Sequence, residues 1–172
     1  MSARIRPAKV GDEKRLPLVG AAPFLEAFAG VLPGQDIMLH CARKHSSAVY
    51  GRWIKKKEAG VWLALAEPGK APIGYAVLDE PDLPIHLRPD DIEVKRVYLL
   101  HRFQGGGTGF ALMQAGLDWA RKRKKKRVLL GVHNGNTTAI SFYRRLGFRP
   151  IGERKFQVGE GWYDDLVMAL DL

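Results

Sequence analysis

The spacing of apolar residues along the chain switches several times between the period of a helix and that of a strand. Residues 11–58 have helical texture, with breaks expected at Pro23, at Pro33-Gly34 and near Ser46-Ser47. Alternating or continuous apolar runs predict strands over residues 3–8, 61–67, 73–80, 91–100, 127–132, 148–158 and 164–170. The second and third of these strands flank a PGKAP turn, so we expect them to form a hairpin.

Two further helices are predicted between the later strands. The first covers about residues 109–125, where Phe110, Met113 and Leu117 fall on one stripe. The second begins after Asn136, a favoured N-cap residue, and ends at Gly147, which suits the position after a helix. The element order predicts an α/β (α+β) fold for a single domain, 1–172. Its sheet is expected to be mixed, mostly antiparallel, of six to seven strands flanked by helices, with a central β-α-β crossover.

The composition narrows the class of protein. Apolar residues make up 46% of the chain and charged residues 27%, and no apolar run reaches about 18 residues, so no membrane span is expected. The opening stretch MSARIRPAKVGDEKR lacks the apolar centre of a secretory signal. The single Cys41 cannot form an internal disulfide, which agrees with a reducing compartment. We therefore expect a cytoplasmic protein with no membrane partner, and we predict no metal site.

The net charge of +10 comes mainly from one segment. The run RKRKKKR at 121–127 carries seven positive charges, and without it the balance is 10 − 7 = +3. The run can be interpreted as a solvated helix end, where cations are favoured, or as a site that attracts nucleic acid or another polyanion. No aromatic residue is interleaved with these lysines, which weakens the case for binding a single strand.

The stretch FQGGGTGF at 103–110 carries the clearest chemical signal. It is not a P-loop, because no lysine follows its last glycine, and it is not a dinucleotide fingerprint, because Phe110 stands where GxGxxG needs its third glycine. It fits Q-x-x-G-x-G over Gln104–Gly109, between a strand and a helix. Amides free of side-chain crowding at a helix N-terminus form a site for an anion such as a diphosphate. The alternative is a tight turn with no ligand.

Two longer segments resemble the GNAT N-acetyltransferase superfamily. KRVYLLHRFQGGGTGFALMQAGLDWA (95–120) looks like that family's acetyl-CoA motif, and LGVHNGNTTAISFYRRLGF (130–148) looks like the motif that follows it. More weakly, IRPAKVGDEKRL (5–16) resembles the usual first strand and helix. GERKFQVGEGWYDDLVMAL (152–170) resembles the C-terminal strands of a spermidine/spermine acetyltransferase-like branch.

The resemblance implies a GNAT-like fold, acetyl-CoA as cofactor and a set of residues that would bind it. In the family the diphosphate lies on the amides of the glycine loop, the pantetheine arm runs beside the preceding strand, and an asparagine contacts the arm. Carried onto this sequence, the cofactor-binding residues are Tyr98, Leu99, Leu100, Gln104, Gly105, Gly106, Gly107, Thr108, Gly109, Phe110, Asn136 and Tyr143. Asn136 could also be no more than a helix cap.

The resemblance also implies catalytic roles. Tyr143 matches the tyrosine that protonates the departing thiolate, as a phenol within hydrogen-bond reach can do. Glu93 is the first candidate for the base that deprotonates the amine, and Asp91 is the second. Core packing is the alternative for Tyr143, and a carboxylate paired with Lys95 is the alternative for Glu93. We expect structural roles for the nearby histidines, His101 and His133.

The predicted function is transfer of an acetyl group from acetyl-CoA to a primary amine by direct attack in a ternary complex. The acceptor could be a polyamine, an amino-acid-like metabolite or a protein amine. The net charge argues against a polyamine, although the acidic residues between 79 and 91 could form a locally acidic cleft. The alternative function is a non-catalytic CoA-binding regulator or a nucleic-acid-associated protein using 121–127. A nucleic-acid partner is not favoured, and a homodimer stays open.

Overall fold

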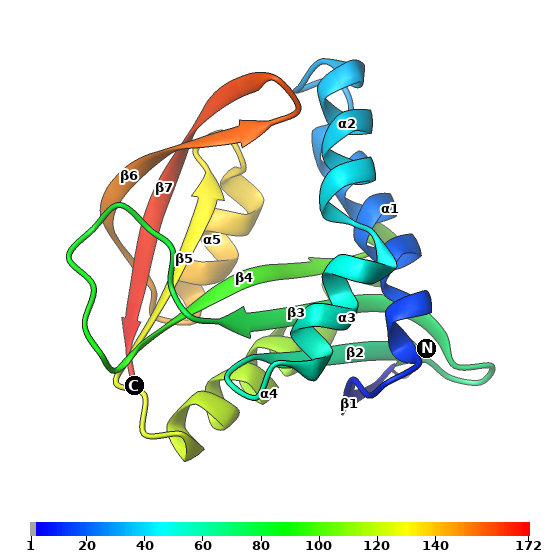
Figure 1. Cartoon of the computed structure of the whole chain (residues 1–172), viewed down its shortest axis with the longest axis horizontal. Coiled ribbons are helices and arrows are strands. Elements are labelled where there is room, and N and C mark those ends of the chain that lie inside the picture. Colours follow the sequence, from blue (N-terminus) through cyan, green and yellow to red (C-terminus); the bar gives the residue numbers. More distant parts are fainter. Residues whose placement is uncertain (1–2) are drawn as a thin grey trace.

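Seven strands form one sheet in the order β1-β2-β3-β4-β5-β7-β6 in the computed structural model, which describes residues 3–172 (Figure 1). The strands are β1 (Ala3–Pro7), β2 (Gly60–Ala66), β3 (Ala71–Asp79), β4 (Asp91–Leu99), β5 (Arg127–His133), β6 (Arg149–Val158) and β7 (Gly161–Asp171). Neighbouring strands are antiparallel except for β4 and β5, which are parallel. The expected mixed, mostly antiparallel sheet is confirmed.

The helices are α1 (Leu16–Phe28), α2 (Gly34–Lys44), α3 (Ser47–Lys55), α4 (Thr108–Lys122) and α5 (Thr137–Arg145), with short 3-10 helices η1 (Asp12–Lys14) and η2 (His101–Phe103). The predicted break near Ser46 is confirmed, because the Ser46 hydroxyl caps α3 by accepting from the amide of Val49. The predicted break at Pro23 is wrong. Helix α1 continues through it because burial of Val19 and Phe24 offsets the hydrogen bond that the proline ring removes.

The two faces of the sheet are covered by different helices. Helices α4 and α5 pack on one face around a core that includes Leu112, Leu117 and Ile140. Helices α1 and α3 pack on the other face, where Leu16 and Tyr50 meet β2 and β3. We call this second side the α1–α3 face. In the part of the chain that the structure describes, no helix is long and apolar enough to cross a membrane.

Strands β4 and β5 pair only at their beginnings and then separate. The pairing runs from Asp91 opposite Arg127 to Val94 opposite Leu130. After that point β4 pairs only with β3, and β5 pairs only with β7. Figure 1 shows the two strands starting together and diverging, with α4 connecting them. The segments 95–99 of β4 and 131–133 of β5 no longer pair with each other, and we call them the β4–β5 divergence. Their facing backbone edges are open to an extended ligand.

A bulge in β4 changes which side chains face the helices at this point. The β3–β4 register skips Lys95, since Val94 pairs with Leu78 and Arg96 pairs with Val77. Lys95 is therefore the extra residue, and both it and Arg96 point to the α1–α3 face. Alternation would instead have placed these neighbours on opposite faces of the sheet.

Candidate active site

The glycine loop presents a continuous row of free backbone donors at the start of α4. Among residues 3–172, no hydrogen bond is donated by any of the six amides from Gly105 to Phe110. No side chain caps the helix, and its N-cap residue, Gly107, has a φ of 83°, which glycine adopts readily. A Cβ built on Gly105, Gly106 or Gly107 would meet no heavy atom within 4 Å. The loop is thus open on its outer side and can hold an anion.

The strand that leads into this loop is fixed by hydrogen bonds that leave the loop amides free. The Gln104 side chain donates to the carbonyl of Leu99 at 3.1 Å, so this side chain braces the loop. The amide of Leu100 donates to the carbonyl of Ile73 at 2.9 Å and is not free to bind a ligand. Of the predicted binding residues, Leu100 and Gln104 therefore have no free amide, because the Gln104 amide donates to the carbonyl of His101 at 2.9 Å. The carbonyl of Leu100 already accepts from the amide of Phe103.

Asn136 has the capping role that the sequence suggested. Its Oδ1 accepts from the amide of Ala139 at 3.1 Å. Its Nδ2 donates no hydrogen bond within the described chain, so a contact with a ligand remains compatible with the cap. Gly147, with a φ of 95°, ends α5, and the amides of Gly147 and Phe148 donate back to the last turn.

Tyr143 lies on the inner side of α5 with its ring against Phe142 and Phe148. Its hydroxyl forms no hydrogen bond with residues 3–172. The hydroxyl is not fully buried, because His45 Nε2 is the only fully buried side-chain polar atom without a partner in that range. Burial, and to a smaller extent the charge of Tyr98, raises the pKa of Tyr143 well above its ordinary value. The phenol therefore stays protonated at neutral pH, with its hydroxyl available to another group.

Glu93 lies just before the β4–β5 divergence, on the α1–α3 face. Its Oε2 accepts from the Lys95 ammonium at 2.6 Å and from the amide of Asp82 at 2.8 Å. Its Oε1 has only the Arg154 guanidinium nearby, at 3.8 Å, which is too long for a hydrogen bond. The predicted pairing with Lys95 is confirmed, but the carboxylate is buried rather than on the surface. One of its oxygens remains able to accept a proton through a water molecule.

Asp91 is not placed to act as a base. It sits at the first residue of β4, at the far end from the glycine loop. Both of its oxygens accept from Arg127, at 2.7 and 2.6 Å, and the Arg88 amide adds a third bond. The carboxylate is buried, and these partners lower the pKa of Asp91 against the opposing effect of burial, which is larger than any one of them. The ion pair fixes the start of the β4–β5 pairing.

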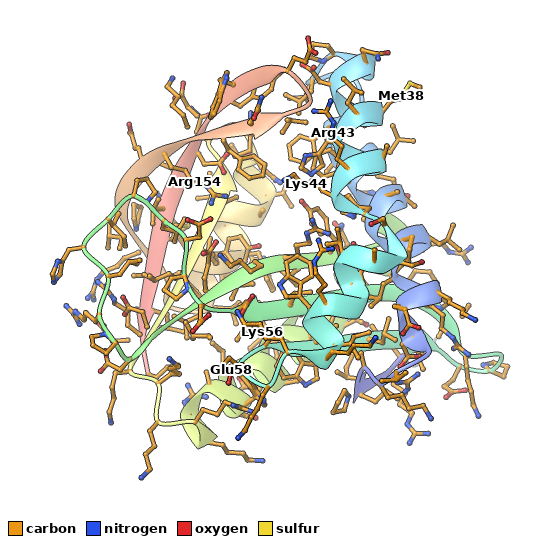
Figure 2. The ribbon with its side chains drawn as sticks, viewed as in Figure 1. Met38, Arg43, Lys44, Lys56, Glu58 and Arg154 are labelled. Atoms are coloured by element: carbon orange, nitrogen blue, oxygen red, sulfur yellow. The ribbon has the colours of Figure 1, made fainter. Side chains whose placement is uncertain are left out.

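The acidic residues around 79–91 are in part paired with cations of the chain itself. Asp79 and Glu80 share the ammonium of Lys56, at 2.8 and 2.9 Å, and Asp79 also accepts from the indole of Trp53. Lys56 is labelled in Figure 2. The carboxylates nearest the sheet are therefore already neutralised by the chain's own cations.

The structure reveals a polar cluster on the α1–α3 face that the sequence did not indicate. The Arg96 Nη1 donates to the Tyr50 hydroxyl at 3.0 Å, and that hydroxyl bonds the Tyr75 hydroxyl at 2.9 Å and His45 Nδ1 at 2.7 Å. Burial, followed by the charge of Arg96, lowers the pKa of His45 to about 3. His45 is thus neutral under physiological conditions. These groups come from α3, β3, β4 and the α2–α3 turn.

Asp165 and Arg154 form a second group that the sequence did not indicate. Arg154 lies across Gly131 of β5, where a Cβ would be only 2.4 Å from its Cζ, and donates to the Asp165 carboxylate at 3.0 Å. Burial raises the pKa of Asp165, and Arg154 opposes this effect. Gly131 is the first residue of β5 that no longer pairs with β4, so this ion pair borders the β4–β5 divergence.

Three cations of the basic run at 121–127 interact with groups of their own chain. Arg127 is buried and bound to Asp91. Arg121 pairs with Asp118, and the Arg123 guanidinium lies 4.4 Å from the ring centroid of Trp119. These three cations are engaged with their own chain, so the run offers a polyanion less charge than its sequence suggests.

Comparison with known proteins identifies the family of this chain. The model of the acetyltransferase (GNAT) family matches residues 35–148, which include the loop, the β4–β5 divergence, Asn136 and Tyr143. The chain belongs to the acetyltransferase (GNAT) family. That membership makes it an acetyl-CoA-dependent acetyltransferase, as the resemblance implied.

Individual relatives and solved structures match nearly the whole length of the chain. An uncharacterised N-acetyltransferase of Mycobacterium tuberculosis is 30% identical over 161 residues, which cover 94% of this chain and 98% of that protein. The solved PaiA N-acetyltransferase of Thermoplasma acidophilum in complex with coenzyme A has a TM-score of 0.81 at 20% identity, over 100% of both chains. The ribosomal-protein-alanine N-acetyltransferase of Brucella melitensis has a TM-score of 0.70 at 25% identity, over 98% and 99%. These three matches do not name a spermidine or spermine enzyme, so that branch stays a prediction.

Proposed function

We propose that this GNAT protein transfers the acetyl group of acetyl-CoA to a primary amine, with both substrates bound together. The observation that carries the proposal is the row of six free amides at the start of α4, directly after the strand that borders the β4–β5 divergence. A diphosphate fits the amides, and an extended arm fits the open strand edge. Acetyl-CoA supplies an acetyl thioester, which an amine attacks without a covalent enzyme intermediate.

The residues around the divergence have complementary tasks in this proposal. The backbone of β4 near Tyr98 and Leu99 positions the arm, and the Nδ2 of Asn136 contacts it. The Tyr143 hydroxyl, protonated and without a partner in the described chain, donates its proton to the departing sulfur. The proton that the amine must lose passes through water to Oε1 of Glu93. The cations beside Glu93, Lys95 and Arg154, lower the pKa of an ammonium bound there and so favour its neutral form.

The test is a thiol-release assay with acetyl-CoA and a panel of amines. The panel contains polyamines, amino acids, their carboxamides and short peptides with free N-termini. We expect thiol release that requires an amine, with an equal amount of acetylated amine found by mass spectrometry. If CoA binds by calorimetry but no amine is acetylated, the protein is the non-catalytic CoA-binding regulator. If CoA does not bind at all, both readings are wrong.

A further inference from the structure

Arg96 is a cation on the α1–α3 face without a carboxylate partner. Among residues 3–172, its hydrogen bonds are made by Nη1 alone, to Tyr50 and, at 3.5 Å, to His45 Nδ1. Its Nε and Nη2 have no hydrogen-bond partner among these residues. In that range, Nε2 of His45 is the only side-chain polar atom that is both fully buried and without a partner. Nε and Nη2 of Arg96 are therefore not fully buried. The open edge of the guanidinium thus remains accessible to a ligand.

The open edge has the shape that a carboxylate needs. Nε–H and Nη2–H point in parallel and form a two-pronged donor. Arg127 in the same chain uses this pair of nitrogens to hold both oxygens of Asp91, at 2.7 and 2.6 Å. The Arg96 guanidinium is held in place from the other side, with its Cζ 5.3 Å from the ring centroid of Tyr50 and 4.9 Å from that of Trp53.

A network behind Arg96 keeps this arrangement rigid. Gly20 of α1 allows the close approach, since a Cβ there would be 2.1 Å from the Tyr50 hydroxyl and 2.4 Å from His45 Nδ1. Tyr98, two residues after Arg96, has its ring stacked on Tyr75, and its hydroxyl makes no hydrogen bond within the described residues. Burial raises the pKa of Tyr98 to about 12, so its hydroxyl is a second donor beside Arg96.

The charges around this position favour an anion. Lys95, Arg96 and Arg154 border the point where β4 and β5 separate, and Lys44 stands on α2. Figure 2 labels Lys44 on α2 and Arg154 on β6. Glu93 and Asp165, which border the divergence, are held by Lys95 and Arg154, and Asp79 farther along this face is held by Lys56. The result is a net positive field, which repels a polycation and attracts a negatively charged group.

We propose that the acceptor is an amine that also carries a carboxylate, as an amino acid does, and that Arg96 binds this carboxylate while the amine points toward the β4–β5 divergence. This inference rests on the proposed function and names its substrate class. Arg96 shares its face of β4 with Tyr98, so a molecule held by its fork lies close to the backbone that would position the thioester. The polyamine acceptor of the spermidine/spermine-like branch does not fit this field.

The experiment compares kcat/KM for matched pairs of amino acids and their carboxamides, in the unmodified protein and in Arg96→Gln. We expect the unmodified protein to prefer the carboxylate of each productive pair by at least about tenfold, because a charged two-pronged bond is lost in the amide. Arg96→Gln should abolish that preference, with the larger loss of kcat/KM in the carboxylate member of each pair. Arg96→Lys, which keeps the charge but not the fork, should keep part of the preference.

Two controls make each outcome decisive. Arg52→Gln removes the same charge from an exposed position of α3 and should keep the full preference. CoA binding measured by calorimetry shows whether Arg96→Gln is folded, since its CoA affinity should not change. Equal turnover of both members of every pair, or better turnover of polyamines, would overturn the carboxylate inference and leave the acetyltransferase intact. Absence of turnover with all amines would instead contradict the proposed function.

Discussion

At the scale of single residues, Tyr143 has a packing role that is compatible with the proposed role as proton donor. Its ring packs between Phe142 and Phe148, so the packing role suggested by the sequence is present. Its hydroxyl nevertheless has no partner within residues 3–172, and burial keeps it protonated. Burial is therefore consistent with the proposal that the phenol donates a proton.

Replacing Tyr143 by phenylalanine removes the hydroxyl and keeps the ring. We expect kcat to fall by roughly 10- to 100-fold, because general acids contribute at least this much, while KM for acetyl-CoA changes by less than about twofold. The raised pKa adds a pH signature to the unmodified enzyme. Because the acid form of Tyr143 persists above the ordinary value of about 10, kcat should not decline between pH 8 and about 10.

Steady-state rates and thermal melting of both proteins check these expectations. A Tyr143→Phe variant with unchanged kcat would show that the side chain serves packing only. A decline of kcat in the unmodified enzyme with a midpoint clearly below 10 would show that another group limits the alkaline side.

At the scale of elements, the packing of α1 against α3 depends on one position without a side chain. Gly20 lies in the middle of α1, where Tyr50 of α3 and His45 come closest to the helix backbone. The same contact places the Tyr50 hydroxyl where Arg96 can donate to it. The geometry of the α1–α3 face at Arg96 therefore depends on the distance between two helices.

Gly20→Ala should destabilise the protein by about 1–3 kcal/mol in spite of the better helix propensity of alanine, because its Cβ overlaps a buried hydroxyl. Gly51→Ala is the matched control in α3, since its Cβ would meet only Glu13, at 3.8 Å. The control should be neutral or more stable by up to about 1 kcal/mol. Urea unfolding measures both. Equal effects of the two substitutions would contradict the close packing described for Gly20.

The elements also show what the sequence could and could not predict. Apolar periodicity predicted all seven strands. The glycine loop, the cap at Asn136 and the helix end at Gly147 were predictable because each depends on residues adjacent in the sequence. The continuation of α1 through Pro23 was not readable, since it depends on tertiary burial. The cluster at Arg96 could not be predicted from the sequence, because an extra residue, Lys95, breaks the alternation of side chains along β4. Its partners come from three other segments, which no local pattern connects.

At the scale of the whole molecule, the β4–β5 divergence connects the two faces of the sheet. In the function that we propose, Tyr143 acts there from the side of α5, and Glu93 and Arg96 act from the α1–α3 face. The glycine loop lies at its open end, directly after β4. In this proposal, one irregularity in the sheet joins the elements that would bind the cofactor to those that would bind the acceptor. The basic run at 121–127 plays no part in this arrangement.

The central claim is that the free amides of the glycine loop bind the diphosphate of CoA, and isothermal titration of CoA tests it most directly. We compare the unmodified protein with Gly106→Glu, which adds a negative charge at a position with no neighbouring atom within 4 Å and no positive φ. Gly34→Glu, with the same charge and equally open surroundings on α2, is the control. We expect one-to-one binding that the control preserves and that Gly106→Glu weakens by at least about tenfold, through repulsion of the diphosphate. Absence of binding in the unmodified protein, or equal binding by all three proteins, would contradict the claim.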